Sequence, residues 1–161
     1  MSELTPEEMR ARLVGAWSLA VAELFRPDGT VIPLFGSAPV SRLFYTDTGD
    51  VSTHIMPGGD PPDGDPPFAS PPVSLYSYCG TYRVEDDSVY HDITVSMNPG
   101  WVGATLRREV SFDGEDLILT TNDSYYQDLE GVIRLRWRRA QSELADEARQ
   151  IAEIKQGSQG R

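Results

Sequence analysis

Apolar and polar residues alternate along most of the chain between residues 15 and 139, a pattern typical of strands with one face on a core. Turn sequences such as RPDG, TDTGD and FDGED separate the alternating runs. Most of the connections are short enough for antiparallel hairpins, so the pattern predicts an all-β fold. Eight strands are predicted, over residues 15–25, 40–46, 50–56, 75–84, 88–97, 103–112, 116–121 and 132–139.

Helical patterns flank the strands at both ends of the chain. Thr5, Pro6 and Glu8 match an N-cap, a first-turn proline and a capping-box acid, which predicts a short helix over about 6–13. The segment SELADEARQIAEIKQ carries apolar residues at helical spacing, and we expect it to pack on the outside of the strands. The final GSQGR is predicted to be a disordered tail. These boundaries divide the chain into an N-terminal helix (1–14), a β domain (15–140) and a C-terminal helix with its tail (141–161).

Eight sequential strands fit either a closed up-and-down barrel or a two-sheet sandwich. The barrel is favoured because closure removes exposed edges and leaves an interior for packed side chains or one small ligand. The segment 57–72 is rich in proline and glycine, which excludes regular strand pairing there. It is either a connector or a lid at the barrel mouth, and as a lid it would bring Phe68 over the opening.

Composition narrows the classes of partner. Fourteen Lys and Arg against twenty-five Asp and Glu give a net charge of −11, which disfavours nucleic acid and anionic membrane surfaces. The single cysteine, Cys79, cannot form an intramolecular disulfide, and the N-terminus lacks the apolar stretch of a signal peptide, so we expect a cytoplasmic protein. Two histidines without ligand-like spacing give no basis for a metal or cofactor site.

His91 and Arg108 stand on strand faces that are otherwise apolar. A buried arginine needs an acid, a wet cavity or an anionic ligand, whereas a neutral histidine needs only a donor and an acceptor. Glu23, on an apolar face of the first strand, is the candidate acid. The apolar residues expected to share these faces are Val89, Ile93, Val95 and Met97 beside His91, and Leu106, Val110 and Phe112 beside Arg108.

These positions define a predicted site inside the barrel. Its catalytic candidates are His91, Arg108 and Glu23. Its ligand-binding candidates are the tyrosines on one face of the fourth strand and aromatic or polar residues at the rim: Tyr76, Tyr78, Tyr82, Phe68, Trp101 and His54. For His54 the alternation leaves both an inward and a solvent-facing orientation open.

The stretch LVGAWSL contains Gly15-Ala16-Trp17, which matches the glycine-any-tryptophan signature of the first lipocalin strand. Further pieces follow in order: IPLFG (32–36), SRLFYTDTGDVS (41–52), YCGTYRV (78–84), VYHDITVSMNPGWVGATLRR (89–108), LILTT (117–121) and LRWRR (135–139). Across roughly residues 12–140 the chain resembles the small bacterial and fungal lipocalin-like domain proteins. That resemblance implies an eight-stranded barrel with an internal pocket, in a group that includes carriers and natural-product isomerases or cyclases.

The chemistry of Trp17 follows independently of the resemblance. An indole at the closed end of a small barrel plugs it, and a cation of the last strand is expected to stack on the ring. The candidates for that cation are Arg136, Arg138 and Arg139.

Two functional hypotheses remain from the sequence, both without cofactor and both compatible with a monomer or a homodimer. One is a cyclase or isomerase that folds a hydrophobic polyketide- or terpene-like intermediate, with His91 as acid, base or oxyanion donor. The other is a carrier for a small apolar molecule with an anionic end, held by Arg108 and a tyrosine. The enzyme is favoured because the interior carries more titratable groups than a passive carrier requires.

Overall fold

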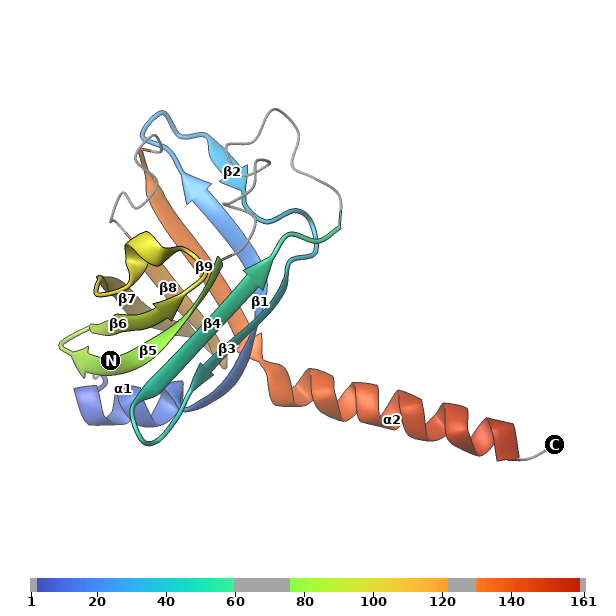
Figure 1. Ribbon diagram of the computed structural model, residues 1–161. Helices are drawn as coiled ribbons and strands as arrows, with labels where there is room; N and C mark the ends of the chain where they lie inside the picture. The colour runs from blue at the N-terminus through green and yellow to red at the C-terminus, as the bar shows by residue number, and fades with distance from the viewer. Residues whose placement is uncertain (1–2, 60–75, 122–129, 160–161) are drawn as a thin grey trace.

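The computed structural model describes residues 3–59, 76–121 and 130–159 (Figure 1). Nine strands are present in these residues, all paired antiparallel. The elements are α1 (Pro6–Leu13), β1 (Gly15–Phe25), β2 (Val31–Pro33), β3 (Val40–Tyr45), β4 (Asp50–Met56), β5 (Tyr76–Glu85), β6 (Ser88–Ser96), the 3-10 turn η1 (Pro99–Trp101), β7 (Thr105–Asp113), β8 (Asp116–Thr121), β9 (Val132–Arg139) and α2 (Ala140–Gln159).

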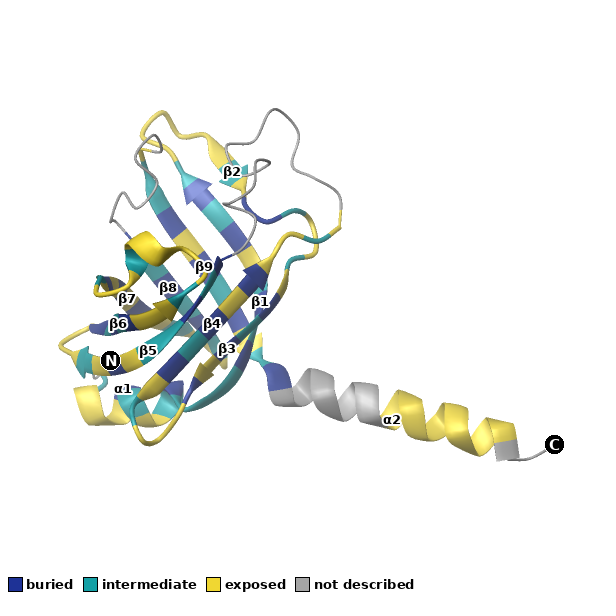
Figure 2. Cartoon of the chain, viewed as in Figure 1, coloured by how far each residue is buried: buried dark blue, intermediate teal, exposed yellow. Residues whose placement is uncertain are grey.

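Eight of the strands form a closed barrel, which confirms the predicted fold class. Strands β3 to β9 follow one another in sequence order, and β9 pairs with β1 to close the sheet. The short β2 adds to the end of β1, so it lies outside the closed circuit. Inner and outer positions alternate along the strands, as the bands of buried and exposed residues show (Figure 2). No helix in the described part of the chain is long and apolar enough to cross a membrane.

The N-terminal helix closes one end of the barrel. Its predicted capping box is present, with Thr5 Oγ1 accepting from the Glu8 amide and Glu8 Oε2 accepting from the Thr5 amide. Leu13 at its end is fully buried, and its carbonyl accepts the indole proton of Trp17 at 2.8 Å. Arg139 places its guanidinium 3.9 Å from the Trp17 ring centroid. The predicted plug and its stacked arginine are therefore confirmed.

Two β-bulges reverse the side-chain alternation part-way along a strand. In β1, Leu19 opposes Trp137 and Val21 opposes Arg136, so Ala20 is the extra residue. In β6, Ile93 opposes Gly80 and Val95 opposes Cys79, so Thr94 is the extra residue. The second bulge brings the β6 backbone so close to Gly80 that a Cβ there would lie 1.9 Å from the Asp92 carbonyl oxygen.

The bulges overturn two sequence predictions. Past Ala20 the buried residues of β1 are Ala22 and Leu24, so Glu23 lies on the outer face. Past Thr94, Val95 and Met97 are 60% and 67% exposed and do not share the face of His91. A sequence pattern of period two cannot signal a single inserted residue, because apolar residues occupy both registers here.

The C-terminal helix α2 is present, but it extends away from the barrel instead of packing along it (Figure 1). Residues 149–158 are all exposed, including Ile151 and Ile154. The helix also runs to Gln159, so the first residues of the predicted tail are helical.

Candidate functional site

His91 and Arg108 lie on the inner faces of the neighbouring strands β6 and β7. The exposed fraction is 2% for His91 and 4% for Arg108, although both side chains are polar. Strand pairing sets His91 opposite Leu106 and Arg108 opposite Val89, which makes the two polar residues diagonal neighbours on the sheet. The two residues that the sequence singled out are therefore both buried, as predicted, within one patch of the barrel interior.

Both ring nitrogens of His91 are engaged by tyrosine hydroxyls. Tyr45 of β3 lies 2.7 Å from Nε2, and Tyr78 of β5 lies 2.6 Å from Nδ1. Burial, and to a smaller extent the positive charge of Arg108, lowers the pKa of His91 to about 3. The imidazole is therefore neutral at physiological pH and has no ring nitrogen left for another partner.

The tyrosines around His91 are kept in their protonated form. Burial raises the pKa of Tyr45 and of Tyr78 well above the ordinary value, and the charge of Arg108 only partly opposes this. For Tyr78 the neighbouring phenol of Tyr76 adds to the upward shift of the pKa. Both side chains therefore act as neutral O–H groups, each with one proton to donate.

Two hydroxyl groups and one carbonyl of the described residues accept hydrogen bonds from Arg108. Its Nη2 donates to the Tyr76 hydroxyl at 2.8 Å, and its Nη1 lies 3.4 Å from Thr121 Oγ1. Nη1 also donates to the main-chain carbonyl of Arg107 at 2.9 Å. The Tyr76 oxygen accepts from a cation, so the Tyr76 proton is directed elsewhere.

Aromatic rings form the wall beside these groups. Tyr76 and Tyr78 contact each other edge-to-face with ring centroids 5.4 Å apart. Trp101, in η1 after β6, contacts Tyr76 at 5.0 Å and Tyr78 at 6.2 Å, and Phe35 contacts Tyr76 at 6.4 Å. Trp101 is therefore placed beside the predicted tyrosines, as expected for a rim residue.

Some of the other predicted site residues lie elsewhere. Glu23 is on the outer face beyond the β1 bulge and does not join His91 and Arg108, so this part of the predicted interior is wrong. His54 is exposed on the outer face of β4, where Ser52 and Ser77 hydroxyls contact its two nitrogens. Phe68 and most of the predicted lid (57–72), from residue 60 onward, lie outside the described residues.

Tyr82 is buried on the same strand face as Tyr76 and Tyr78, but its hydroxyl serves the barrel end. It donates to the Thr46 carbonyl at 2.6 Å, while its ring packs on Tyr45 and beneath the guanidinium of Arg10. Tyr82 therefore contributes to the site only by packing on Tyr45, because its hydroxyl is directed to the Thr46 carbonyl.

Tyr45 and Thr53 are among the residues of the site that the sequence analysis did not single out. Tyr45 alternates with the buried Ser41 and Leu43 on β3, and this alternation was a usable signal for its inward orientation. Thr53 lies directly opposite Tyr78 and is 3% exposed, yet no described residue gives its Oγ1 a hydrogen bond of normal geometry. A threonine in a strand carries no sequence signal of this kind, because threonine is common on both faces of sheets.

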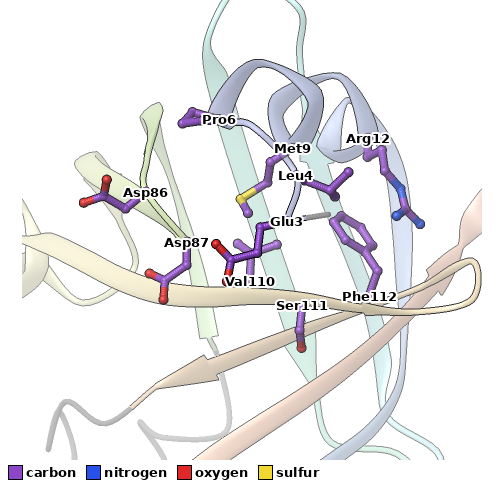
Figure 3. Close-up of a pocket in the computed structure, with 10 residues that line it drawn as sticks. All are labelled: Glu3, Leu4, Pro6, Met9, Arg12, Asp86, Asp87, Val110, Ser111 and Phe112. Carbon is purple, nitrogen blue, oxygen red and sulfur yellow. The ribbon is translucent and has the colours of Figure 1, made fainter. Parts of the chain in front are cut away.

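A separate groove of about 940 Å³ lies outside the barrel, between α1, the β5–β6 turn and β7 (Figure 3). Its apolar residues are Leu4, Met9, Val110 and Phe112, and the carboxylates of Glu3, Asp86 and Asp87 lie around them. None of the residues around His91 lines this groove. The interior cluster and the outer groove are therefore distinct.

Comparison with known proteins points to one family. A family model described as "Lipocalin-like domain" matches residues 14–140. A solved lipocalin-like protein from Bacteroides uniformis is similar, with 15% identity and a TM-score of 0.46 over 80% of this chain and 98% of the other. An uncharacterized protein from Bacteroides eggerthii is similar at 16% identity and a TM-score of 0.42, over 78% of this chain and 98% of the other. No curated protein matches the chain.

Proposed function

Because the chain belongs to the lipocalin-like domain family, we propose that its barrel binds a small, mainly hydrophobic molecule, with the anionic or carbonyl end of that molecule near Arg108. The observation that carries the proposal is a guanidinium buried to 4% exposure on the inner face, hydrogen bonded to Tyr76. A cation at this place attracts a carboxylate or enolate far more strongly than one in water, because the surrounding dielectric is low. The aromatic wall of Tyr76, Tyr78 and Trp101 suits a flat apolar body.

The test is a fluorescence titration with two probes of the same shape, 2-naphthoate and naphthalene. We expect Arg108→Met to weaken naphthoate binding at least about tenfold, the effect of losing one charge-assisted hydrogen bond, and to leave naphthalene binding nearly unchanged. Arg107→Met is the matched control, since Arg107 is the adjacent residue, is exposed, and contacts Asp87 at 3.5 Å. Arg108→Lys keeps the charge and serves if the Met variant fails to fold. Naphthoate binding that is equal in all variants would refute the proposed role of Arg108.

A cofactor-independent cyclase or isomerase is the second candidate, favoured by the hydroxyl groups of Tyr76 and Tyr78, both of which are buried. His91 is a poor acid or base for it, because its pKa is about 3 and both nitrogens are engaged. Such an enzyme would act by folding its substrate and by donating hydrogen bonds to a carbonyl that gains negative charge.

A suitable substrate to test the enzyme hypothesis is a linear enone that carries a 1,3-diketone in the same chain. Its cyclisation forms a C–C bond between the diketone carbon and the enone β-carbon, and one proton moves to the enone α-carbon. The product has the same mass and a new chromatographic retention time. Protein-dependent cyclisation that falls in Tyr78→Phe supports the enzyme, and recovery of unchanged ligand supports the carrier.

A further inference from the structure

The hydrogen bonds of His91 have a direction that can be worked out from its neighbours. A neutral imidazole has one N–H donor and one acceptor nitrogen. If Nδ1 carries the proton, Tyr45 donates to Nε2, Nδ1 donates to the Tyr78 oxygen, and the Tyr78 proton is left over. If Nε2 carries the proton, both bonds reverse and the Tyr45 proton is left over. The two arrangements therefore differ in which tyrosine donates onward.

The surroundings of the two hydroxyls decide between these arrangements. Within the described residues, the only polar partner of the Tyr45 hydroxyl is His91, so a leftover proton there would have no acceptor. Next to Tyr78 lies Thr53, its direct cross-strand neighbour. The Thr53 hydroxyl is close enough to lower the pKa of Tyr78 slightly against the effect of burial, yet its buried Oγ1 forms no hydrogen bond of normal geometry. A proton left over on Tyr78 therefore lies next to a second hydroxyl without a hydrogen bond of normal geometry, where one acceptor oxygen can serve both groups. This favours the arrangement with the proton on Nδ1.

We propose that Tyr78 and Thr53 form a two-donor subsite for a single acceptor oxygen of the ligand, a carbonyl, enolate or phenolate oxygen, and that Tyr45 and His91 fix the direction of the Tyr78 donor. This inference rests on the proposed function and specifies the chemistry of the ligand. Two neighbouring O–H groups are satisfied together by one oxygen that has two lone pairs. The positive charge of Arg108 acts on the same group of side chains and favours an oxygen with negative charge.

Tyr45 and His91 are positioning residues in this proposal, because neither contacts the ligand oxygen. They act by holding the Tyr78 oxygen as an acceptor from Nδ1, which leaves only its proton for the ligand. The arrangement is independent of pH over the physiological range, because burial keeps His91 neutral and the two phenols protonated.

The first experiment tests the direction of the hydrogen bonds between Tyr45, His91 and Tyr78, and it needs no ligand. Nitrogen NMR of protein labelled with 15N-histidine reports which ring nitrogen carries the proton, and the His54→Gln variant identifies the signals of His91. We expect His91 as the neutral Nδ1–H tautomer, unchanged between pH 5 and pH 8. Finding the Nε2–H tautomer or an imidazolium would overturn the proposed direction.

The second experiment tests the subsite with 2-naphthol, compared with naphthalene. We expect Tyr78→Phe and Thr53→Val each to weaken naphthol binding about five- to tenfold, the effect of one neutral hydrogen bond, with naphthalene binding unchanged. Tyr45→Phe should also weaken naphthol binding and convert part of His91 to the other tautomer, a spectroscopic change that loss of packing alone does not produce. Tyr82→Phe is the matched control, because its hydroxyl donates to the Thr46 carbonyl and takes no part in the hydrogen bonds of Tyr45, His91 and Tyr78.

The outcomes separate the subsite from the proposed function. If naphthalene and naphthoate bind but naphthol gains nothing from Tyr78 and Thr53, the subsite is wrong and a buried water satisfies the two hydroxyls. If none of the three aromatic probes binds the unmodified protein, the proposed function itself fails and the ligand half of this inference fails with it. The NMR experiment tests the tautomer of His91 independently of either binding result.

Discussion

Two arginines lie against buried aromatic residues at different levels of the barrel, and the protein holds them in different ways. Arg139, at the closed end, donates to the main-chain carbonyls of Val14 at 2.8 Å and Arg12 at 2.5 Å and covers the ring of Trp17. Arg108, in the interior, also donates to one main-chain carbonyl, that of Arg107, but its other hydrogen bonds in the described residues go to the side-chain hydroxyls of Tyr76 and Thr121.

The difference lies in what each partner can do next. A main-chain carbonyl accepts hydrogen bonds and cannot donate one, so no further hydrogen bond follows from those of Arg139. They hold the end of α1 against the barrel. A hydroxyl accepts one hydrogen bond and donates another. Tyr76 accepts from Arg108 and therefore still has its own proton to donate to a further acceptor. The same residue type is therefore structural at the closed end and suited to ligand binding in the interior.

Removing the plug should have the largest effect on stability. Trp17 is fully buried, and Trp17→Ala is expected to lower the free energy of unfolding by about 4 kcal/mol, measured by urea denaturation, because it leaves a large cavity under α1. Trp101→Ala is the control, since this half-buried tryptophan sits at the rim. Trp101→Ala should lower the free energy of unfolding much less than Trp17→Ala does, and it should weaken probe binding more. The reverse ranking would contradict the division into a structural end and a binding interior.

The two arginines themselves should respond in opposite ways. Arg139→Met is expected to lower the free energy of unfolding by about 2 kcal/mol, because two main-chain carbonyls lose a charged donor, and to leave naphthoate affinity unchanged. Urea denaturation and the naphthoate titration measure the two effects on one variant. If Arg139→Met weakened naphthoate binding as much as Arg108→Met does, the comparison would not hold.

The buried histidine should make the protein sensitive to mild acid. The pKa of His91 is lowered to about 3 in the folded state, whereas a histidine of the unfolded chain has a pKa of about 6.5. Between these two pH values the unfolded chain binds a proton at this residue and the folded chain does not. Stability is therefore retained above the unfolded pKa and falls as the pH falls through this window. Between pH 7 and pH 5 we expect a loss of about 2 kcal/mol from this residue.

The measurement is urea denaturation at several pH values for the unmodified protein and two variants. His91→Gln should lose this part of the pH dependence, whereas His54→Gln should keep it because His54 is exposed. An unmodified protein with the same pH dependence as His91→Gln would show that His91 is not buried in neutral form.

Local sequence rules predicted most of the fold. The capping box at Thr5, the alternation along the strands and the tryptophan plug all depend on neighbouring residues or on period two, and all are present. The site was predicted in part. His91 and Arg108 stood out because polar residues interrupt apolar faces, and the tyrosines of β5 stood out by spacing.

The remainder depended on events that a linear pattern does not record. An extra residue at Ala20 or Thr94 moves every later side chain of its strand to the other face, which misplaced Glu23 and Val95. The partnership of Tyr45 with His91 joins β3 to β6 across the barrel interior. It follows from closure of the sheet and not from any spacing in the sequence.

Glu23 gives the smallest expected effect and the sharpest test of the β1 bulge. If Glu23 were the buried partner of Arg108, removing both would restore much of the stability lost with Arg108 alone, because no buried charge would remain unpaired. The bulge instead puts Glu23 on the outer face, opposite Arg134 of β9. We therefore expect Glu23→Leu alone to change the free energy of unfolding by less than about 0.5 kcal/mol. Its effect should add to that of Arg108→Met with an interaction energy below about 0.5 kcal/mol in a double-mutant cycle. An interaction energy of several kcal/mol would place Glu23 beside Arg108 inside the barrel and would mean that the β1 alternation runs unbroken past Ala20.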